Sequence, residues 1–150
     1  MKIKILVLGK TKEEYLKKGI GNYLKRLSFY CNLEWIELIL FQNKSSQQEV
    51  SKKIKKIFNS HSYIIAMDEH GKEFTSRKFA SFIEKMMVGG KEELGFILGG
   101  PFGLSSEIIN QVDMTFSLSR MTFPHQMVRL IFIEQLYRAF TIIKGEAYHH

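Results

Sequence analysis

Short apolar runs alternate with longer amphipathic stretches along this chain of 150 residues, and that alternation constrains the fold most strongly. The apolar runs have the length of strands, which are predicted at residues 3–8, 33–41, 62–67, 95–98 and 115–119. Helical spacing predicts helices at residues 13–27, 45–59, 76–88, 105–111 and 125–144. Alternating strands and helices are typical of a mostly parallel sheet with helices on both faces. We therefore predict an α/β fold in which residues 1–150 form a single domain.

The composition favours a folded, basic protein. Hydrophobic residues make up 45% of the chain, which argues against intrinsic disorder. Lys and Arg number 22 against 15 Asp and Glu, and the resulting net charge of +7 favours a polyanionic partner such as nucleic acid. The positive charge is concentrated in residues 17–26 and 52–56, which are predicted to be folded helical surface. Ordinary solubility charge is the competing explanation, and composition alone does not separate the two.

Cysteine and histidine usage indicates neither disulfide nor metal. The single cysteine, Cys31, excludes an internal disulfide and fits a reducing compartment. The five histidines lack metal-ligand spacing such as H-E-x-x-H, so no metal site is expected. The opening apolar run is too short for a signal peptide and no stretch reaches transmembrane length, so a cytoplasmic protein without membrane contact is expected.

Three loops that follow predicted strands form the candidate ligand site. They are residues 68–71, 99–103 and 120–125, and ligands of open α/β sheets bind beyond the carboxyl ends of the strands. The second loop, with the sequence GGPFG, would let backbone approach a ligand closely. It matches neither the P-loop pattern nor G-x-G-x-x-G, so a P-loop nucleotidase and a standard dinucleotide fold are disfavoured. A tight turn without function explains this loop equally well.

The helix predicted at residues 125–144 is apolar almost all round. Its polar stripe includes Glu134 and Arg138, which are spaced as an i,i+4 pair. So wide an apolar surface must be buried on more than one side. We infer that a second subunit packs against this helix in a symmetric dimer, and the alternative is that the helix lies at the centre of the core of one chain. Arg129 lies roughly opposite the polar stripe, where an arginine is costly unless paired. A phosphate or substrate contact is favoured for Arg129 over a position at an interface edge.

Five segments together resemble the RlmH family, which comprises ribosomal RNA large subunit pseudouridine methyltransferases of the SPOUT superfamily. The segments are residues 98–104 (LGGPFGL), 117–125 (SLSRMTFPH), 128–129 (VR), 134–139 (EQLYRA) and 145–149 (GEAYH). The opening ILVLGK also resembles the start of the family. The combination and order of these motifs is specific, although no single motif is, and the resemblance covers essentially the whole chain.

The resemblance implies a trefoil-knotted α/β fold and a homodimer with each site near the subunit interface. It also implies that a methyl group passes from S-adenosylmethionine to N3 of a pseudouridine in helix 69 of 23S ribosomal RNA, within the assembled ribosome. Met67 stands at a cofactor position where the family usually has Leu. The resemblance implies that the following residues bind the cofactor: Met67, Gly99, Leu118, Ser119, Arg120, Met121, Thr122 and Phe123.

Methyl transfer to N3 requires that this nitrogen lose its proton, so a base or an anion-stabilising group is expected beside it. Arg129 or Arg138 is the hypothetical group that orients the RNA or stabilises the developing anion. Tyr148 and His149 are expected to complete the pocket, with His149 as the titratable candidate for proton removal. Two alternatives stay open, namely a SPOUT methyltransferase acting on another RNA, such as transfer RNA, and a non-enzymatic ribosome-binding protein.

Overall fold

A five-stranded parallel sheet forms the centre of the molecule. The structure, a computed structural model, describes residues 1–39 and 47–150. Within these ranges the strand order is β2-β1-β4-β3-β5, and neighbouring strands are parallel, so the predicted α/β class is confirmed. The strands are β1 (Lys2–Leu8), β2 (Asn32–Leu38), β3 (Tyr63–Glu73), β4 (Glu93–Leu98) and β5 (Met114–Ser117). The helices are α1 (Glu14–Leu27), α2 (Gln47–Ile57), α3 (Ser76–Val88), α4 (Ser106–Ile109) and α5 (His125–Lys144).

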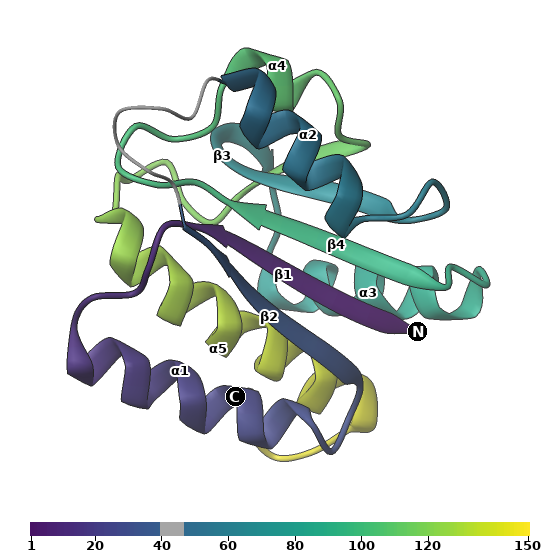
Figure 1. Ribbon diagram of the computed structural model, residues 1–150. Helices are drawn as coiled ribbons and strands as arrows, with labels where there is room; N and C mark the ends of the chain where they lie inside the picture. The colour runs from purple at the N-terminus through teal and green to yellow at the C-terminus, as the bar shows by residue number, and fades with distance from the viewer. Residues whose placement is uncertain (40–46) are drawn as a thin grey trace.

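Helices cover both faces of this sheet (Figure 1). Helices α1, α3 and α5 lie on one face, and α2 and α4 lie on the other. Successive side chains of β1 point to opposite faces, so Ile3, Ile5 and Val7 join the larger apolar core while Leu6 and Leu8 join the smaller core under α2 and α4. The central strand β4 is buried at every position, which explains why its sequence ELGFIL is almost continuously apolar.

The predicted elements agree with the structure in kind, and all but two of them differ from it at one end or both. The helices predicted at residues 76–88 and 125–144 match α3 and α5 at both ends. The strand predicted at residues 33–41 and the helix predicted at residues 45–59 each extend into residues 40–46, which lie outside the described residues. Short elements have few local signals, and the helix predicted at residues 105–111 is accordingly shorter in the structure.

Strand β3 is longer than predicted and carries a bulge at its centre. The apolar pattern ends at Met67, whereas the structure continues the strand to Glu73. Its register with β5 shifts after Met67, so residues 68–71 loop out of the ladder. A Cβ on Gly71 would lie 2.6 Å from the backbone nitrogen of Phe116, so glycine allows the strand to return to the sheet here. The second half of the strand escapes prediction because its residues are mostly polar.

Helix α5 is surrounded by other elements of the same chain. It packs between α1 and α3 and against the sheet, and Phe132, Ile133, Leu136 and Phe140 are all buried. A second subunit was the expected cover for its wide apolar surface, but α1, α3 and the sheet provide most of that cover. The helical spacing of apolar residues shows how much of the surface of α5 must be buried, but it does not show which element packs against that surface. Gly145 follows the last helical residue with φ 69°, the left-handed conformation in which a glycine commonly ends a helix.

Candidate active site

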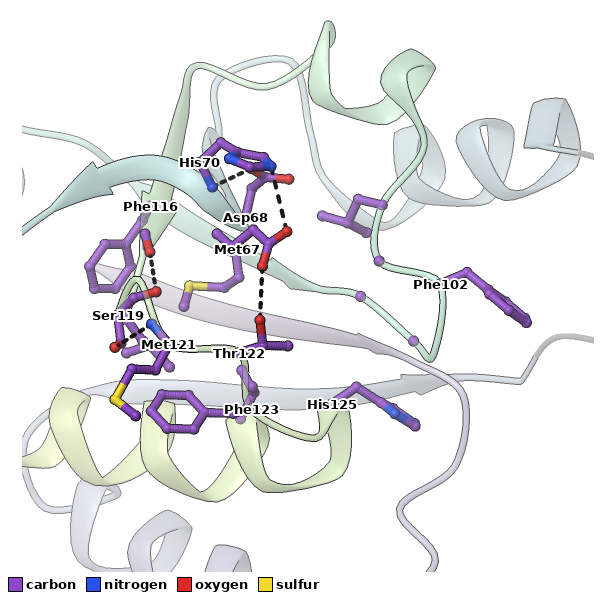
Figure 2. A pocket seen from close by; sticks show the side chains of 18 of the residues that line it. Met67, Asp68, His70, Phe102, Phe116, Ser119, Met121, Thr122, Phe123 and His125 are labelled. Carbon is purple, nitrogen blue, oxygen red and sulfur yellow. Dashed lines mark hydrogen bonds and ion pairs between the residues drawn. The ribbon is translucent and has the colours of Figure 1, made fainter.

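The three loops predicted from the sequence meet at one cavity of about 510 Å³. The bulge of β3 forms one wall, the glycine loop after β4 forms another, and the segment between β5 and α5 forms the third (Figure 2). The volume lies within the range of small-molecule sites. The lining residues are Met67, Asp68, Glu69, His70, Gly99, Gly100, Pro101, Phe102, Gly103, Leu104, Phe116, Ser117, Leu118, Ser119, Met121, Thr122, Phe123, His125 and Val128.

The glycine loop is a closed turn. The Gly103 N–H donates to the Gly100 carbonyl oxygen at 3.1 Å, and Gly103 adopts the left-handed conformation with φ 71°. A Cβ on Gly99 would lie 2.8 Å from the carbonyl carbon of Gly103, so a side chain does not fit there. A Cβ on Gly100 would lie 3.3 Å from the Leu8 carbonyl oxygen, which places the turn against the end of β1. At Gly99, Gly100 and Gly103 the turn therefore brings backbone without a side chain to the wall of the cavity.

Hydrogen bonds from hydroxyl groups hold the segment between β5 and α5. Ser117 Oγ donates to the Ser119 carbonyl oxygen at 2.9 Å, and Ser119 Oγ accepts the Met121 N–H at 3.0 Å. Thr122 Oγ1 donates to Glu69 Oε2 at 3.4 Å and so connects this segment to the β3 bulge (Figure 2). Two walls of the cavity are thereby tied together without a ligand.

The charged groups of the lining are acidic. Asp68 and Glu69 bring two carboxylates to the bulge, where Asp68 Oδ1 accepts the His70 N–H at 2.8 Å. No lysine or arginine occurs among the lining residues of the described ranges. Partial burial lowers the pKa of His125 below its ordinary value, and the nearby cations Arg129 and Lys12 lower it further, so its ring is neutral at pH 7. Such a lining suits a cationic ligand better than a polyphosphate.

Arg120 is the one predicted cofactor position that does not line the cavity. Its side chain is 89% exposed, and its Nε donates to Glu73 Oε1 at 3.0 Å. The segment has no regular period, so the sequence could not show which of its side chains turns outward. The predicted positions that do line the cavity are Met67, Gly99, Leu118, Ser119, Met121, Thr122 and Phe123.

Arg129 is fully buried beside the cavity and does not line it. Its Nη1 donates to Thr11 Oγ1 and its Nη2 to the Leu8 carbonyl oxygen, both at 2.9 Å. Burial lowers the pKa of the guanidinium, and the more distant charge of Glu37 partly offsets this effect. The hypothesis that Arg129 contacts RNA or stabilises an anion does not fit this geometry, because the side chain reaches no solvent. It clamps the loop after β1 instead, and its two acceptors reduce the cost of burying it.

The other predicted catalytic residues gather around Glu134, towards the opposite end of α5. Glu134 Oε1 accepts hydrogen bonds from Arg138 Nη2 at 2.6 Å and from the Tyr148 hydroxyl at 3.0 Å, which confirms the i,i+4 pair. The Tyr148 hydroxyl also lies 3.3 Å from the Tyr23 hydroxyl. Arg138 Nη1 lies 3.3 Å from His149 Nδ1, and because a guanidinium only donates, Nδ1 is the acceptor.

This tail cluster, defined as Glu134, Arg138, Tyr148 and His149, contains two strong donors. The hydrogen bond to Glu134 raises the pKa of Arg138, and burial together with the contacts to Tyr23 and Glu134 raises the pKa of Tyr148. Both groups therefore stay protonated at neutral pH. The rise of an α-helix places Arg138 about 20 Å along α5 from His125. The tail cluster does not complete the cavity of the same chain, because α5 carries it towards the other end of the sheet.

Gln126 does not line the cavity but holds a loop beside it, and no sequence motif indicates this role. Its Nε2 donates to the Lys10 carbonyl oxygen at 3.1 Å, and its Oε1 accepts the Lys12 N–H at 3.0 Å. One amide side chain thus fixes the backbone of the loop after β1 against the start of α5. A single glutamine in the first turn of a helix carries no sequence signal for this role, because its partners lie 114 and 116 residues away.

Cys31 lies outside this cavity and is half-buried. Burial raises its thiol pKa to about 11, so the thiol is protonated and unreactive at neutral pH. Within residues 1–39 and 47–150 no group of three or more His, Cys, Asp or Glu side chains could hold a metal ion. In the same part of the chain no helix combines the length and the apolar character that crossing a membrane requires.

Solved methylase structures share this fold. A probable methylase family protein from Haemophilus influenzae matches with a TM-score of 0.57 and 11% identity, covering 99% of this chain and 70% of that one. A tRNA methyltransferase from Aquifex aeolicus matches with a TM-score of 0.56 and 13% identity, covering 92% of this chain and 70% of that one. At such low identities the likeness concerns the fold alone.

The sequence comparison is more specific. A family model described as "Predicted SPOUT methyltransferase" matches residues 1–149, and the chain belongs to this family of methyltransferases. Relatives named ribosomal RNA large subunit methyltransferase H include proteins from Carboxydothermus hydrogenoformans, at 45% identity over 99% of both chains, and Acetivibrio thermocellus, at 40% over 99% of both. The protein of that name from Cytophaga hutchinsonii is 44% identical over 100% of both chains. The resemblance to the RlmH family inferred from the motifs is therefore confirmed.

Proposed function

We propose that this chain transfers the methyl group of S-adenosylmethionine to N3 of a pseudouridine in helix 69 of 23S ribosomal RNA, within the assembled ribosome. We infer further that it acts in the cytoplasm as a homodimer and that its C-terminal part is threaded in the trefoil knot of the family. The observation that carries the proposal is the cavity where the loops after β3, β4 and β5 meet, lined by seven of the eight expected cofactor positions. The names of the relatives support the choice of ribosomal RNA as the substrate.

The lining of the cavity fits S-adenosylmethionine. The carboxylates of Asp68 and Glu69 are suited to a ligand that carries ammonium and sulfonium cations. Apolar side chains from two walls, including Met67, Leu118 and Phe123, can enclose an adenine ring. A cofactor without phosphate needs no lysine or arginine, and the described lining residues include neither. When bound, the cofactor supplies an electrophilic methyl carbon, and the chain positions the acceptor nitrogen in line with it.

A second copy of the chain would bring the tail cluster to the cavity. Helix α5 retains an outward stripe in which Met127 is 41% exposed and Ile131 and Gln135 are half-buried. This stripe borders a second cavity of about 340 Å³, which shares Leu118 and Phe123 with the first. A two-fold axis across the stripe would run two α5 helices in opposite directions, so that each tail cluster would approach the cavity of the other subunit.

The tail cluster has the groups that deprotonation of N3 requires. In the proposed reaction the N3 proton passes to His149, and the N3 lone pair forms the N–C bond as the S–C bond breaks. Arg138 and Tyr148 are protonated donors and are suited to stabilise the negative charge that develops on the base. The lone pair of His149 Nδ1 is engaged by Arg138, so proton uptake at that atom requires release of this contact. His149→Ala with undiminished turnover would exclude the histidine as the base.

The experiment that tests the function combines the protein with radiolabelled S-adenosylmethionine and with ribosomes that lack this modification. We expect label at N3 of a helix 69 pseudouridine, which would establish cofactor, reaction and substrate together. Label on another RNA, such as transfer RNA, would retain the methyltransferase and exclude the proposed substrate. The absence of label beside an active control enzyme, together with no binding of S-adenosylmethionine, would favour a ribosome-binding protein without activity.

A further inference from the structure

The side chain of Phe102 is exposed to solvent at the tip of the glycine loop. Its side chain is 100% exposed, the largest value among the large apolar side chains of the described residues. It lies inside the turn that the Gly100–Gly103 hydrogen bond and bridge close, so the loop presents it on a constrained backbone. Figure 2 shows the ring pointing away from the cavity, on the side where the chain leaves β1. Burying a phenylalanine side chain is favourable, and the folded chain forgoes this gain at Phe102.

Lys10 and Lys12 lie on the same side of the cavity. The loop that carries them begins at the end of β1, against which the glycine turn packs through Gly100 and Leu8. Gln126 binds the backbone of both lysines, and both side chains are exposed. Lys12 is close enough to His125 to lower the pKa of that ring, and His125 lines the cavity. An exposed aromatic ring and two exposed lysines therefore lie on neighbouring loops beside the cavity, and hydrogen bonds hold the backbone of both loops.

We propose that Phe102, Lys10 and Lys12 form a docking rim for the RNA strand beside the target nucleotide. Phe102 stacks on a flanking base, and the two lysines neutralise neighbouring phosphates. This inference rests on the proposed function, because the rim borders the proposed cofactor cavity. A nucleotide whose base enters such a cavity leaves its stack, and the base next to it then exposes a π-face that an aromatic side chain can cover. The positive charge of the rim matches a polyanion, and its constrained backbone reduces the entropy lost on docking.

Steady-state kinetics with ribosomes that lack the modification test the stacking. Base stacking of about 1–3 kcal/mol predicts that Phe102→Ala raises the KM for ribosomes about 5- to 150-fold. Phe102→Trp should retain the wild-type KM, whereas Phe102→Leu, which is apolar but cannot stack, should behave as the alanine variant does. The matched control is Phe29→Ala, since Phe29 is 83% exposed and follows α1 at the opposite end of the sheet. The Kd for S-adenosylmethionine, measured by calorimetry, should be unchanged in Phe29→Ala. Because Phe102 also lines the cavity, the same measurement on its variants separates an effect on cofactor binding from an effect on the KM for ribosomes.

Salt dependence tests the lysines. Each phosphate contact contributes about 0.7–0.9 to the steepness with which log affinity for ribosomes falls as log salt concentration rises. The double variant Lys10→Gln/Lys12→Gln should therefore reduce this slope by about 1.4–1.8. The matched control is Lys53→Gln/Lys56→Gln, an exposed pair on α2 that lies on the other face of the sheet. An unchanged slope in the rim variant, or an equal reduction in the control, would overturn the assignment of these two lysines.

Three outcomes would reject the rim. A wild-type KM for Phe102→Ala, or for Phe102→Leu, would exclude stacking at this position. A change in the oligomeric state of Phe102→Ala, measured by sedimentation, would show that the ring is a contact between subunits. If the wild-type protein methylates a different RNA, the same variants are measured with that RNA and the same criteria apply. Wild-type protein that binds S-adenosylmethionine but methylates no RNA would reject the proposed function and the rim together, which distinguishes this failure from that of the rim alone.

Discussion

Replacing Gly99 by alanine tests how closely cofactor binding depends on the glycine turn. The new Cβ would lie 2.8 Å from the carbonyl carbon of Gly103, whereas ordinary contacts begin at 3.4 Å, so the backbone must shift by about 0.6 Å. That shift stretches the 3.1 Å hydrogen bond between Gly103 and Gly100. Loss of the bond costs about 0.5–1.5 kcal/mol and residual strain about 1–3 kcal/mol. The free protein relaxes by opening the turn, and a ligand that requires the closed turn then binds about 10- to 2,000-fold more weakly.

Isothermal titration with S-adenosylmethionine measures this effect, and urea unfolding shows whether the variant is folded. The matched control is Gly21→Ala, because Gly21 is an exposed position of α1 where a Cβ meets no atom within 4 Å. Alanine should stabilise that helix by about 0.5–1 kcal/mol and leave the cofactor affinity unchanged. If the wild-type protein binds the cofactor and the Kd of Gly99→Ala lies within about threefold of the wild-type Kd, the closed turn is not required and the reasoning is refuted.

Three further variants test other parts of the structure. Burial raises the pKa of Glu93, but hydrogen bonds from Ser62 and Lys4 bring this pKa below its ordinary value. The contribution of Glu93 to stability is therefore present above about pH 4.5 and lost as the pH falls. The free energy of unfolding of Glu93→Gln, measured with urea, should accordingly decline less between about pH 5 and pH 3 than that of the wild type. Arg129→Lys cannot reach both acceptors of the guanidinium and should lose about 1.5–3 kcal/mol of unfolding free energy, so an unchanged urea midpoint would contradict the clamp. Glu134→Gln weakens the charge-assisted hydrogen bonds that hold the C-terminal tail, so amide hydrogen exchange at residues 146–149 should accelerate about 10- to 150-fold. Unaltered protection of these amides would show that other contacts hold the tail.

The accuracy of each prediction from sequence follows from the range of the interactions behind it. The helical period is a local signal, so the limits of α5 could be predicted. The carboxyl ends of parallel strands share one edge of a sheet, so the three loops could also be grouped from the sequence. The continuation of β3 past Met67 could not be predicted, because its polar second half is stabilised by pairing with β5 and not by its own apolar pattern.

The candidate site divides in the same way. The motifs were sufficient for the family, and seven of the eight expected cofactor positions line the cavity, with Arg120 as the exception. The burial of Arg129 agrees with its place opposite the polar stripe of α5, but its partner Thr11 lies 118 residues away, so the sequence could not show that it serves as an internal clamp. The role of Gln126 was hidden for the same reason.

Local patterns and motifs of the chain were enough for the class of fold, the order of strands and helices, the family and the three loops that line the cavity. Three features emerged only from the folded molecule: α1, α3 and the sheet cover most of α5, the tail cluster lies away from the cavity of the same chain, and Phe102 stays in solvent. The physical reason is that burial, pairing and exposure of a side chain depend on residues brought beside it from distant parts of the chain. The pattern of any one segment carries no information about which neighbours those are.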